Sequence, residues 1–264
     1  MEVYFMLFLC GLAIGILGTL IGAGGGFILV PLLLVLYPKE SPEIITSISL
    51  AVTCLNAFSG TIAYAKLKRI HYKYGCIFTV ASIPGAVLGA ISTNYISRSI
   101  FDFMFGILLL SISVFVFFRN PAPHLDEENK KIDEIHLSAK QLRLGILLSV
   151  GISFIASFVG IGGGIIHVPA LSTFLGFPIH FATATSHFVL AITSLMGTIV
   201  HIIGGSFHRG MRRTIAIGFG VVIGAQIGAL LSSKIKGQTI LKALAFALFL
   251  VGMRLIVFAF IKAN

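Results

Sequence analysis

Long apolar runs, separated by short polar stretches, follow one another along almost the whole chain. The runs that reach the length of a bilayer-spanning helix cover residues 3–36, 43–65, 74–96, 99–118, 143–176, 179–204, 214–233 and 239–261. A helix of about 20 apolar residues is long enough to cross a bilayer. The pattern therefore predicts an all-α polytopic membrane protein with about eight transmembrane segments, and it leaves almost no chain for a soluble domain.

The first and fifth apolar runs contain the same glycine-rich phrase. Residues 21–31 read IGAGGGFILVP and residues 159–169 read VGIGGGIIHVP, with seven of eleven positions identical at an offset of 138. The match continues into the following segments, where Ser49 corresponds to Ser186. We conclude that one membrane-embedded unit is duplicated in this chain.

The duplication divides the chain into two homologous four-segment repeats, residues 1–118 and residues 142–264. Between them, residues 119–141 form a long polar stretch in which acidic and basic side chains alternate. Pro121 and Pro123 end the preceding segment, because proline lacks the N–H group that a helix needs. We expect residues 119–141 to be a solvated central loop.

Consecutive glycines interrupt both copies of the phrase, at Gly24 to Gly26 and at Gly162 to Gly164. Glycine has poor helix propensity, and Pro31 and Pro169 each remove a backbone donor shortly afterwards. Lipid cannot satisfy the N–H groups of a broken helix, so such a break must face protein or a wet cavity. Segments 1 and 5 are therefore predicted to be broken or re-entrant. The N-terminus of the half-helix that restarts there suits an anion.

The segments beside the breaks carry hydroxyls and an amide rather than carboxylates. Besides the glycines, the candidate substrate-binding residues are Thr46, Ser49, Asn56, His167, Thr185, Ser186 and His187. Asp and Glu are missing from the depth of every run, and cation carriers usually need a carboxylate there to offset the desolvation of the ion. This residue set predicts an anionic or neutral substrate.

Three membrane histidines, His167, His187 and His201, belong to the second repeat alone. Histidine titrates near neutrality, so it can bind an anion or carry a coupled proton. The alternative is a neutral histidine that bonds a neighbouring helix. A divalent-metal carrier is a further alternative, but the histidine spacings match no ligand motif, and we expect no metal site.

Composition agrees with a membrane class, since hydrophobic residues make up 57%, charged residues 11%, and mean hydropathy is +1.03. The net charge of +10 comes from basic residues in short loops, which the positive-inside rule explains better than nucleic-acid binding. Two of these loops, residues 66–73 and 209–213, are strongly basic. With eight crossings they lie on one side, so we favour parallel repeats and cytoplasmic termini. If segments 1 and 5 are re-entrant, the repeats are inverted and one basic loop lies outside.

The paired phrase G-x-G-G-G-F/I-I-x-x-V-P, followed each time by a Thr/Ser-rich span, resembles the TauE/SafE family of sulfite-exporter-like permeases. The resemblance covers nearly the whole chain and implies seven or eight spans in two related halves. It also implies movement of small sulfur-containing anions, such as sulfite or organosulfonates, outward across the inner membrane. By that resemblance the family positions are Gly22, Gly24, Gly25, Gly26 and Pro31, with Gly160, Gly162, Gly163, Gly164 and Pro169.

We therefore expect a secondary transporter that exports a small anion, sulfite or another sulfur-containing anion, across the cytoplasmic membrane. The expected partners are this solute and the lipid bilayer, without nucleic acid; a homo-oligomer stays open. The chain has no P-loop, G-x-S-x-G elbow or HExxH motif, so we expect neither an enzyme nor a cofactor. The alternatives are an anion channel, the divalent-metal carrier named above, and an intramembrane enzyme.

Overall fold

The computed structural model describes residues 2–118, 135–232, 246 and 248–257. These residues form helices and the connections between them, without a strand among them. The first half contains α1 (Glu2–Ile21), α2 (Gly26–Leu36), α3 (Pro42–Lys66), α4 (Tyr72–Ser92), η1 (Thr93–Tyr95) and α5 (Arg98–Phe118). The second half contains α6 (Ala139–Phe158), α7 (Gly164–Leu175), α8 (Ile179–Ile203), α9 (Phe207–Leu231) and a short apolar helix at Leu248–Val257.

In the described residues, 6 helices are long and apolar enough to cross a membrane: α1, α3, α4 extended by η1, α6, α8 and α9. Three apolar helices are shorter: α2, α7 and Leu248–Val257. The all-helical membrane class predicted from the sequence is confirmed. Two of the eight expected spans have no counterpart among these six. They are residues 99–118, which lie in α5, and residues 239–261, of which the structure describes only 246 and 248–257. The first and fifth apolar runs are each divided into two helices.

The breaks lie at the glycines in both copies. Positive φ angles occur at Gly22 (82°), Gly24 (76°), Gly25 (80°), Gly160 (78°), Gly162 (77°) and Gly163 (99°). Residues with a side chain rarely adopt this left-handed backbone conformation, so glycine is the residue that permits the turn. The prediction that Pro31 and Pro169 break the helices is wrong, since they lie inside α2 and α7. Each proline removes one helix hydrogen bond without ending its helix.

The equivalent helices α3 and α8 run antiparallel. A Cβ atom built on Gly60 would lie 2.6 Å from the His187 ring, and one on Gly197 would lie 2.9 Å from Leu50. Residue numbers therefore fall along α8 as they rise along α3. Two copies related by a parallel repeat would instead have α3 and α8 pointing the same way.

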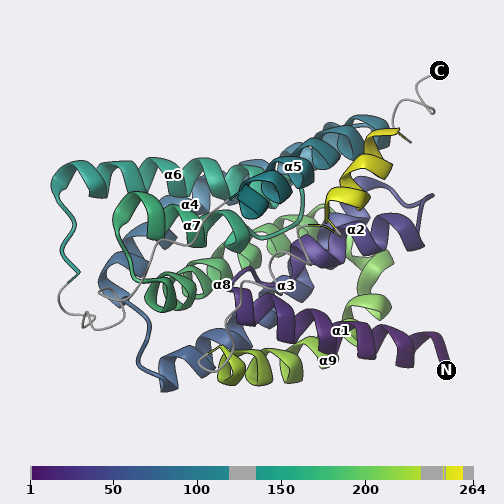
Figure 1. The fold of residues 1–264 in the computed structure, drawn as a ribbon. Helices are drawn as coiled ribbons and strands as arrows, with labels where there is room; N and C mark the ends of the chain where they lie inside the picture. The colour runs from purple at the N-terminus through teal and green to yellow at the C-terminus, as the bar shows by residue number, and fades with distance from the viewer. Residues whose placement is uncertain (1, 119–134, 233–245, 247, 258–264) are drawn as a thin grey trace.

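Helix α9 runs parallel to both α1 and α3. Touching pairs are Gly11 with Ile217 and Gly15 with Val221 on α1, and Ile48 with Gly210 and Leu55 with Gly218 on α3. Because α1 and α3 therefore point the same way, the intervening α2 runs back toward the end where α1 begins (Figure 1). Helices α1 and α2 form a re-entrant hairpin.

The second half repeats this arrangement from the opposite end of the bundle. Helix α6 runs parallel to α4, with Gly85 against Val150 and Gly89 against Phe154. The α6–α7 hairpin enters from the left in Figure 1, whereas the α1–α2 hairpin enters from the right. The favoured parallel arrangement is therefore wrong, and the two halves are inverted. The charge pattern gave the wrong arrangement because two basic loops do not show whether segments 1 and 5 cross the membrane or turn back within it.

The inversion also separates the two basic loops. Residues 66–73 follow the end of α3, whereas Gly210 of the 209–213 stretch packs against Ile48, near the start of α3. Arg213 also lies at the start of α3, because its Nη1 is 2.9 Å from Oε1 of Glu40 in the connection before that helix. The two loops cannot share one side, and the argument that placed both termini in the cytoplasm no longer holds.

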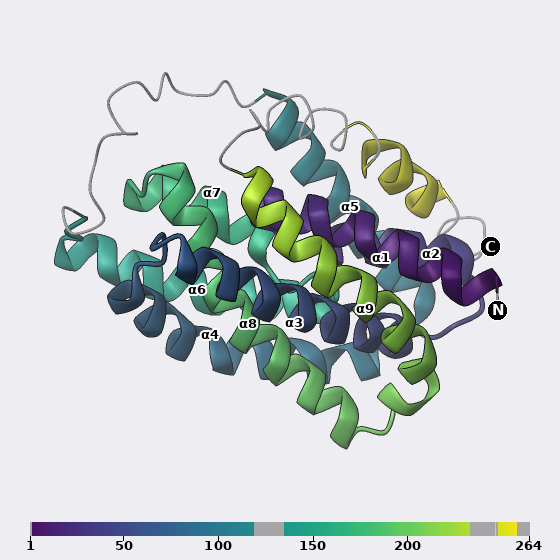
Figure 2. The ribbon, with the colours of Figure 1, turned by 90° about the horizontal axis from the view of Figure 1, so that it is seen from below.

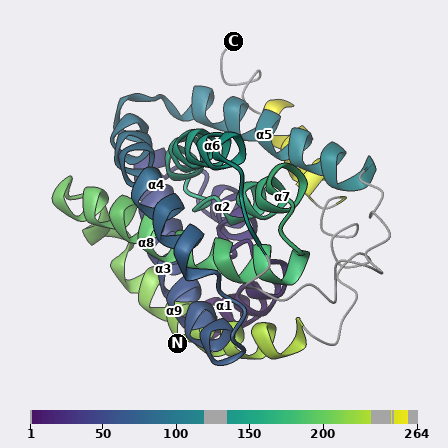
Figure 3. The same cartoon turned by 90° about the vertical axis from the view of Figure 1, so that its left-hand side faces the viewer.

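Small residues let the first helix of each half approach a helix of the other half closely. Figure 2 shows α1 and α9 side by side, and Figure 3 shows α4 beside α6. Gly11 and Gly15 of α1 lie directly against the α9 backbone. Gly18 instead packs against Gly24 and Gly25 of the break.

Candidate functional site

The two glycine breaks meet in the middle of the bundle. A Cβ atom on Gly26 would lie 2.8 Å from the carbonyl oxygen of Ile161, and one on Gly164 would lie 2.5 Å from that of Gly22. The first residues of α2 and α7 therefore lie beside the opposite break. Since the hairpins enter from opposite ends, the N-termini of both half-helices converge on the same central region (Figure 1).

Backbone donors are free at these N-termini. The carbonyl of Gly25 accepts from Ile28 and Leu29, and that of Gly163 accepts from Ile166 and His167. Within the described chain, the N–H groups of the first two residues of each half-helix have no acceptor: Gly26, Phe27, Gly164 and Ile165. Free N–H groups and the positive end of the helix dipole suit an anion.

Two side chains at equivalent positions occupy the space between the breaks. Thr53 of α3 and Leu190 of α8 both lie next to Gly24 and Gly162. Thr53 also places Oγ1 beside Gly26, where a Cβ atom would meet it at 2.7 Å. Sequence reasoning did not single out Thr53, because it is one of many hydroxyl residues in its segment and has no hydroxyl counterpart in α8.

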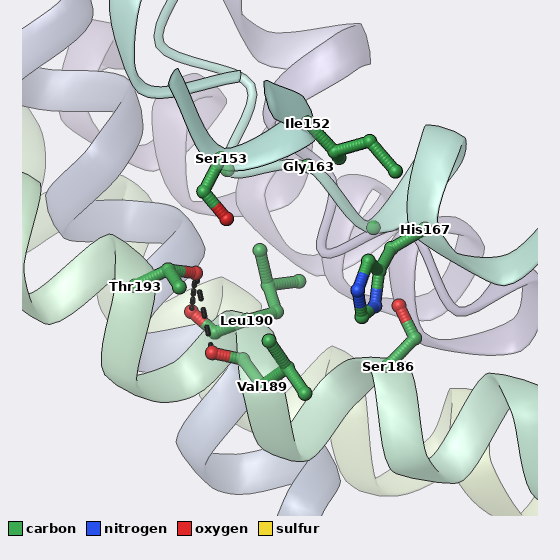
Figure 4. Close-up of a pocket in the computed structure, with 10 residues that line it drawn as sticks. Ile152, Ser153, Gly163, His167, Ser186, Val189, Leu190 and Thr193 are labelled. Atoms are coloured by element: carbon green, nitrogen blue, oxygen red, sulfur yellow. Dashed lines mark hydrogen bonds between the residues drawn. The ribbon is translucent and has the colours of Figure 1, made fainter. Parts of the chain in front are cut away.

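A small cavity lies at the second break (Figure 4). Its volume of about 10 Å³ is the room that one water molecule needs. The residues that line it are Ile152, Ser153, Gly162, Gly163, Gly164, His167, Ser186, Val189, Leu190 and Thr193. The predicted site residues that the structure brings together here are Gly162, Gly163, Gly164, His167 and Ser186. Ser153 and Thr193 join them as hydroxyls that were not predicted.

Two polar atoms on residues that line this cavity have no hydrogen-bond partner among the described residues. They are Oγ of Ser186 and Nδ1 of His167, both on side chains that are at least nine-tenths buried. Figure 4 shows the imidazole of His167 beside the hydroxyl of Ser186. An unsatisfied buried donor costs about 1–3 kcal/mol. An oxyanion has several heavy atoms, so it would need a wider cavity than the one-water space seen here. In a widened cavity it would satisfy these groups together with the N–H groups at the start of α7.

The polar side chains at the first break have different hydrogen-bond partners from those at the second, although both breaks have the same backbone conformation. Ser49, the counterpart of Ser186, donates a 2.6 Å hydrogen bond to the carbonyl of Gly160. Asn56 accepts a 2.6 Å hydrogen bond from Thr19 through Oδ1. Its Nδ2 and the Thr53 hydroxyl remain unpartnered and buried. The first break therefore also presents polar groups, but its predicted serine is already engaged.

Other predicted residues lie away from the cavity. Thr46 donates its hydroxyl to the carbonyl of Pro42 at 2.9 Å, within its own helix, and packs against Gly160. Thr185 accepts a 3.1 Å hydrogen bond from the N–H of His71, just before α4. The contacts of both threonines are those of structural residues.

The three membrane histidines are separated. His187 packs against Gly60 and edge-on against Tyr64, at 5.5 Å between ring centroids, and both its ring nitrogens are unpartnered. His201 lies 3.4 Å from the Thr46 hydroxyl. In the part of the chain that the structure describes, no group of three or more His, Cys, Asp or Glu could hold a metal ion. The divalent-metal alternative therefore has no preformed site among these residues.

Comparison with known proteins gives one consistent result. The family model described as "Sulfite exporter TauE/SafE" matches residues 7–255. "Probable membrane transporter protein YunE" of Bacillus subtilis (strain 168) is 31% identical over 267 residues, which cover 96% of this chain and 97% of that protein. A "Probable membrane transporter protein" of Xylella fastidiosa (strain 9a5c) is 26% identical over 252 residues, covering 94% and 91%. No solved structure matches the chain significantly.

Proposed function

The chain belongs to the TauE/SafE family of membrane transporters, and from this premise we propose that it is a secondary permease for a small oxyanion. The observation that carries the proposal is the cavity at the second break. There the free N–H groups at the start of α7 lie with two unpartnered polar atoms, Ser186 Oγ and His167 Nδ1. Among the described residues, no acidic side chain lines this cavity. Donors without a nearby carboxylate favour an anion over a cation.

A sulfur-containing anion, sulfite first among them, is the proposed substrate, and export across the cytoplasmic membrane is the proposed direction. The family description, which names sulfite export, supports this choice. The cavity supports a small ligand, because its lining offers several hydrogen-bond donors around little space. We further propose that residues 1–118 and 142–264 act as the two repeats, rocking about the central site to open it to either side.

The test is ligand-dependent thermal stability of the purified protein. The panel contains sulfite, sulfate, thiosulfate, small sulfonates, acetate and phosphate, with Zn²⁺ and Mn²⁺ as controls. An anion at 100 times its Kd adds about 2.7 kcal/mol of stability. We expect a sulfur oxyanion to raise the melting temperature selectively.

Gly163→Ala and Gly176→Ala form a matched pair for this assay. Both glycines have positive φ, 99° and 70°, so alanine costs each roughly 1–2 kcal/mol. Gly163 lines the cavity, whereas a Cβ atom on Gly176 would meet nothing within 4 Å. Only Gly163→Ala should lose the anion response. An equal loss in both variants, or a response to metals alone, would reject the proposed site.

Transport in proteoliposomes separates the permease from a channel. A permease gives a flux of sulfite that saturates with concentration and returns the anion chemically unchanged. Flux that rises linearly, with no dependence on a counter-ion, would indicate an anion channel. A chemically altered product would indicate an intramembrane enzyme.

A further inference from the structure

His167 is held by a residue that the cavity itself does not include. Its Nε2 lies 3.1 Å from Oγ of Ser149 on α6, and Ser149 is 1% exposed. The ring of Phe78 packs edge-on against the imidazole, with 6.3 Å between centroids. These two contacts fix the plane of the ring, and Nδ1 has no hydrogen-bond partner among the described residues. His167 itself lines the cavity.

The number of hydrogen-bonding groups left unsatisfied decides which ring nitrogen of His167 carries the proton. In the neutral ring one nitrogen donates and the other accepts. Among the described residues, Nε2 of His167 is the one partner of the Ser149 hydroxyl. If Nε2 donated to Ser149, the serine proton and the Nδ1 lone pair would both be unsatisfied. If Ser149 donates to Nε2, the single unsatisfied group is an N–H at Nδ1.

The second arrangement costs less, because each buried unsatisfied group carries its own desolvation penalty. A doubly protonated ring would be a buried charge with no acidic residue among the cavity lining, which is costlier still. The tautomer with the proton on Nδ1 is therefore favoured. It makes a neutral histidine a hydrogen-bond donor, and this histidine lines the same cavity as Ser186 and Gly164, the first residue of α7.

We propose that Ser149 is a positioning residue that holds His167 in the Nδ1–H tautomer, so that the imidazole donates a hydrogen bond to the bound anion. The tautomer follows from the geometry alone, whereas the hydrogen bond to an anion rests on the proposed function. The first repeat has Leu29 at the corresponding position, so this device belongs to the second break.

Nitrogen-15 NMR of the full-length protein, labelled at histidine, reads the tautomer directly, because protonated and unprotonated imidazole nitrogens resonate far apart. The chain has 8 histidines, so His167 is assigned from the signals that His167→Gln removes. We expect the wild type to show the proton on Nδ1. Ser149→Ala should give a mixture of tautomers, and Ser149→Thr, which keeps the hydroxyl, should restore the wild-type signal.

Sulfite binding to the same proteins supplies the second readout. Loss of the fixed donor in Ser149→Ala should weaken sulfite binding on the order of tenfold, with Ser149→Thr close to wild type. An Nε2–H tautomer in the wild type, or a Ser149→Ala spectrum identical to it, overturns the positioning role. If the wild type shows the Nδ1 proton but binds no anion of the panel, the positioning role stands and the proposed function falls.

Discussion

At the scale of single residues, the two halves have a serine at equivalent positions, and the two serines make different contacts. Ser49 donates to the carbonyl of Gly160 and thereby ties α3 to the opposite break. Ser186, its counterpart, lines the cavity, and its hydroxyl has no hydrogen-bond partner in the part of the chain that the structure describes. A duplicated sequence thus gives one hydroxyl that stabilises the fold and one that is available to a ligand.

Ser186→Ala should separate binding from stability. The variant removes a donor to a charged ligand, worth about 1.5–3 kcal/mol, so sulfite affinity should fall roughly tenfold or more. The melting temperature without ligand should not fall, because Ser186 Oγ makes no hydrogen bond within the protein. Both quantities come from the same thermal-shift titration.

Ser194→Ala is the matched control for that change. Ser194 lies on the same helix, is equally buried, and donates its hydroxyl to the carbonyl of Leu190 one turn earlier. It does not line the cavity, so sulfite affinity should stay at the wild-type value. Equal affinities in the Ser186 and Ser194 variants would count against the site.

At the scale of elements, glycines set how closely the two halves cross. Helix α9 presents Gly220, Gly224 and Gly228, one turn apart, to the backbone of α1. In lipid, such small-residue faces hold helices together through close packing, since apolar burial gives no advantage over contact with lipid tails. The α4–α6 pair repeats this arrangement with Gly85 and Gly89.

Gly224→Val should therefore destabilise the fold. The new Cβ atom would clash with the carbonyl oxygen of Leu12 and lie 2.9 Å from the backbone nitrogen of Ile16. Helix α1 must therefore move away. Overpacking of this kind costs about 1–3 kcal/mol, and more where backbone is the neighbour. The measurement is the melting temperature and the yield of monodisperse protein in detergent.

Gly151→Val serves as the control for the loss of glycine itself. Gly151 is an exposed helical residue of α6, and a Cβ atom there would meet nothing within 4 Å. It should keep the wild-type melting temperature. If Gly224→Val were as stable as Gly151→Val, the close α1–α9 crossing would be wrong.

At the scale of the whole molecule, the inversion of the two halves is the main result. Two re-entrant hairpins enter from opposite ends, and their half-helix N-termini meet in the middle (Figure 1). Under the proposed function, the site lies between both repeats, so that a rocking motion of either would expose it to one side at a time. The inverted arrangement thus supports the proposed carrier mechanism.

Cysteine labelling from one side of the membrane tests this topology. Cys10, Cys54 and Cys76 are first replaced by serine, and Lys66→Cys or Arg209→Cys is then introduced at an exposed position. Lys66 ends α3, whereas Arg209 precedes Gly210, which packs against Ile48 near the start of α3. The 18 residues from Ile48 to Lys66 rise about 27 Å along the helix.

A membrane-impermeant maleimide added to intact cells should label one of these two variants and not the other. Permeabilised cells, in which both must react, provide the control for cysteine reactivity. Labelling of both variants, or of neither, in intact cells would restore the parallel arrangement. The labelled variant also identifies which end of the bundle faces outward.

The sequence by itself determined the membrane class, the duplication and the location of the breaks. These are local properties: apolar run length, an 11-residue phrase written twice, and consecutive glycines that no helix tolerates without cost. It also led to Ser186, His167 and the glycines of the cavity, because polar residues beside a broken helix need partners. It misassigned Pro31 and Pro169, since proline inside a helix removes a bond without stopping the chain.

Only the tertiary structure decided the directions of the helices and the membership of the site. Whether a run of 34 residues crosses or turns back depends on which helices it packs against, and those contacts join residues more than 100 positions apart, such as Gly15 and Val221. Long-range contacts also decide the roles of single residues. They give Ser49 a partner in Gly160 and Thr185 a partner in His71, so that neither hydroxyl is available at the cavity. Ser149 lies beside His167 because α6 packs against α7. Identical residues acquired different roles because their neighbours, not their own chemistry, left some hydrogen bonds unmade.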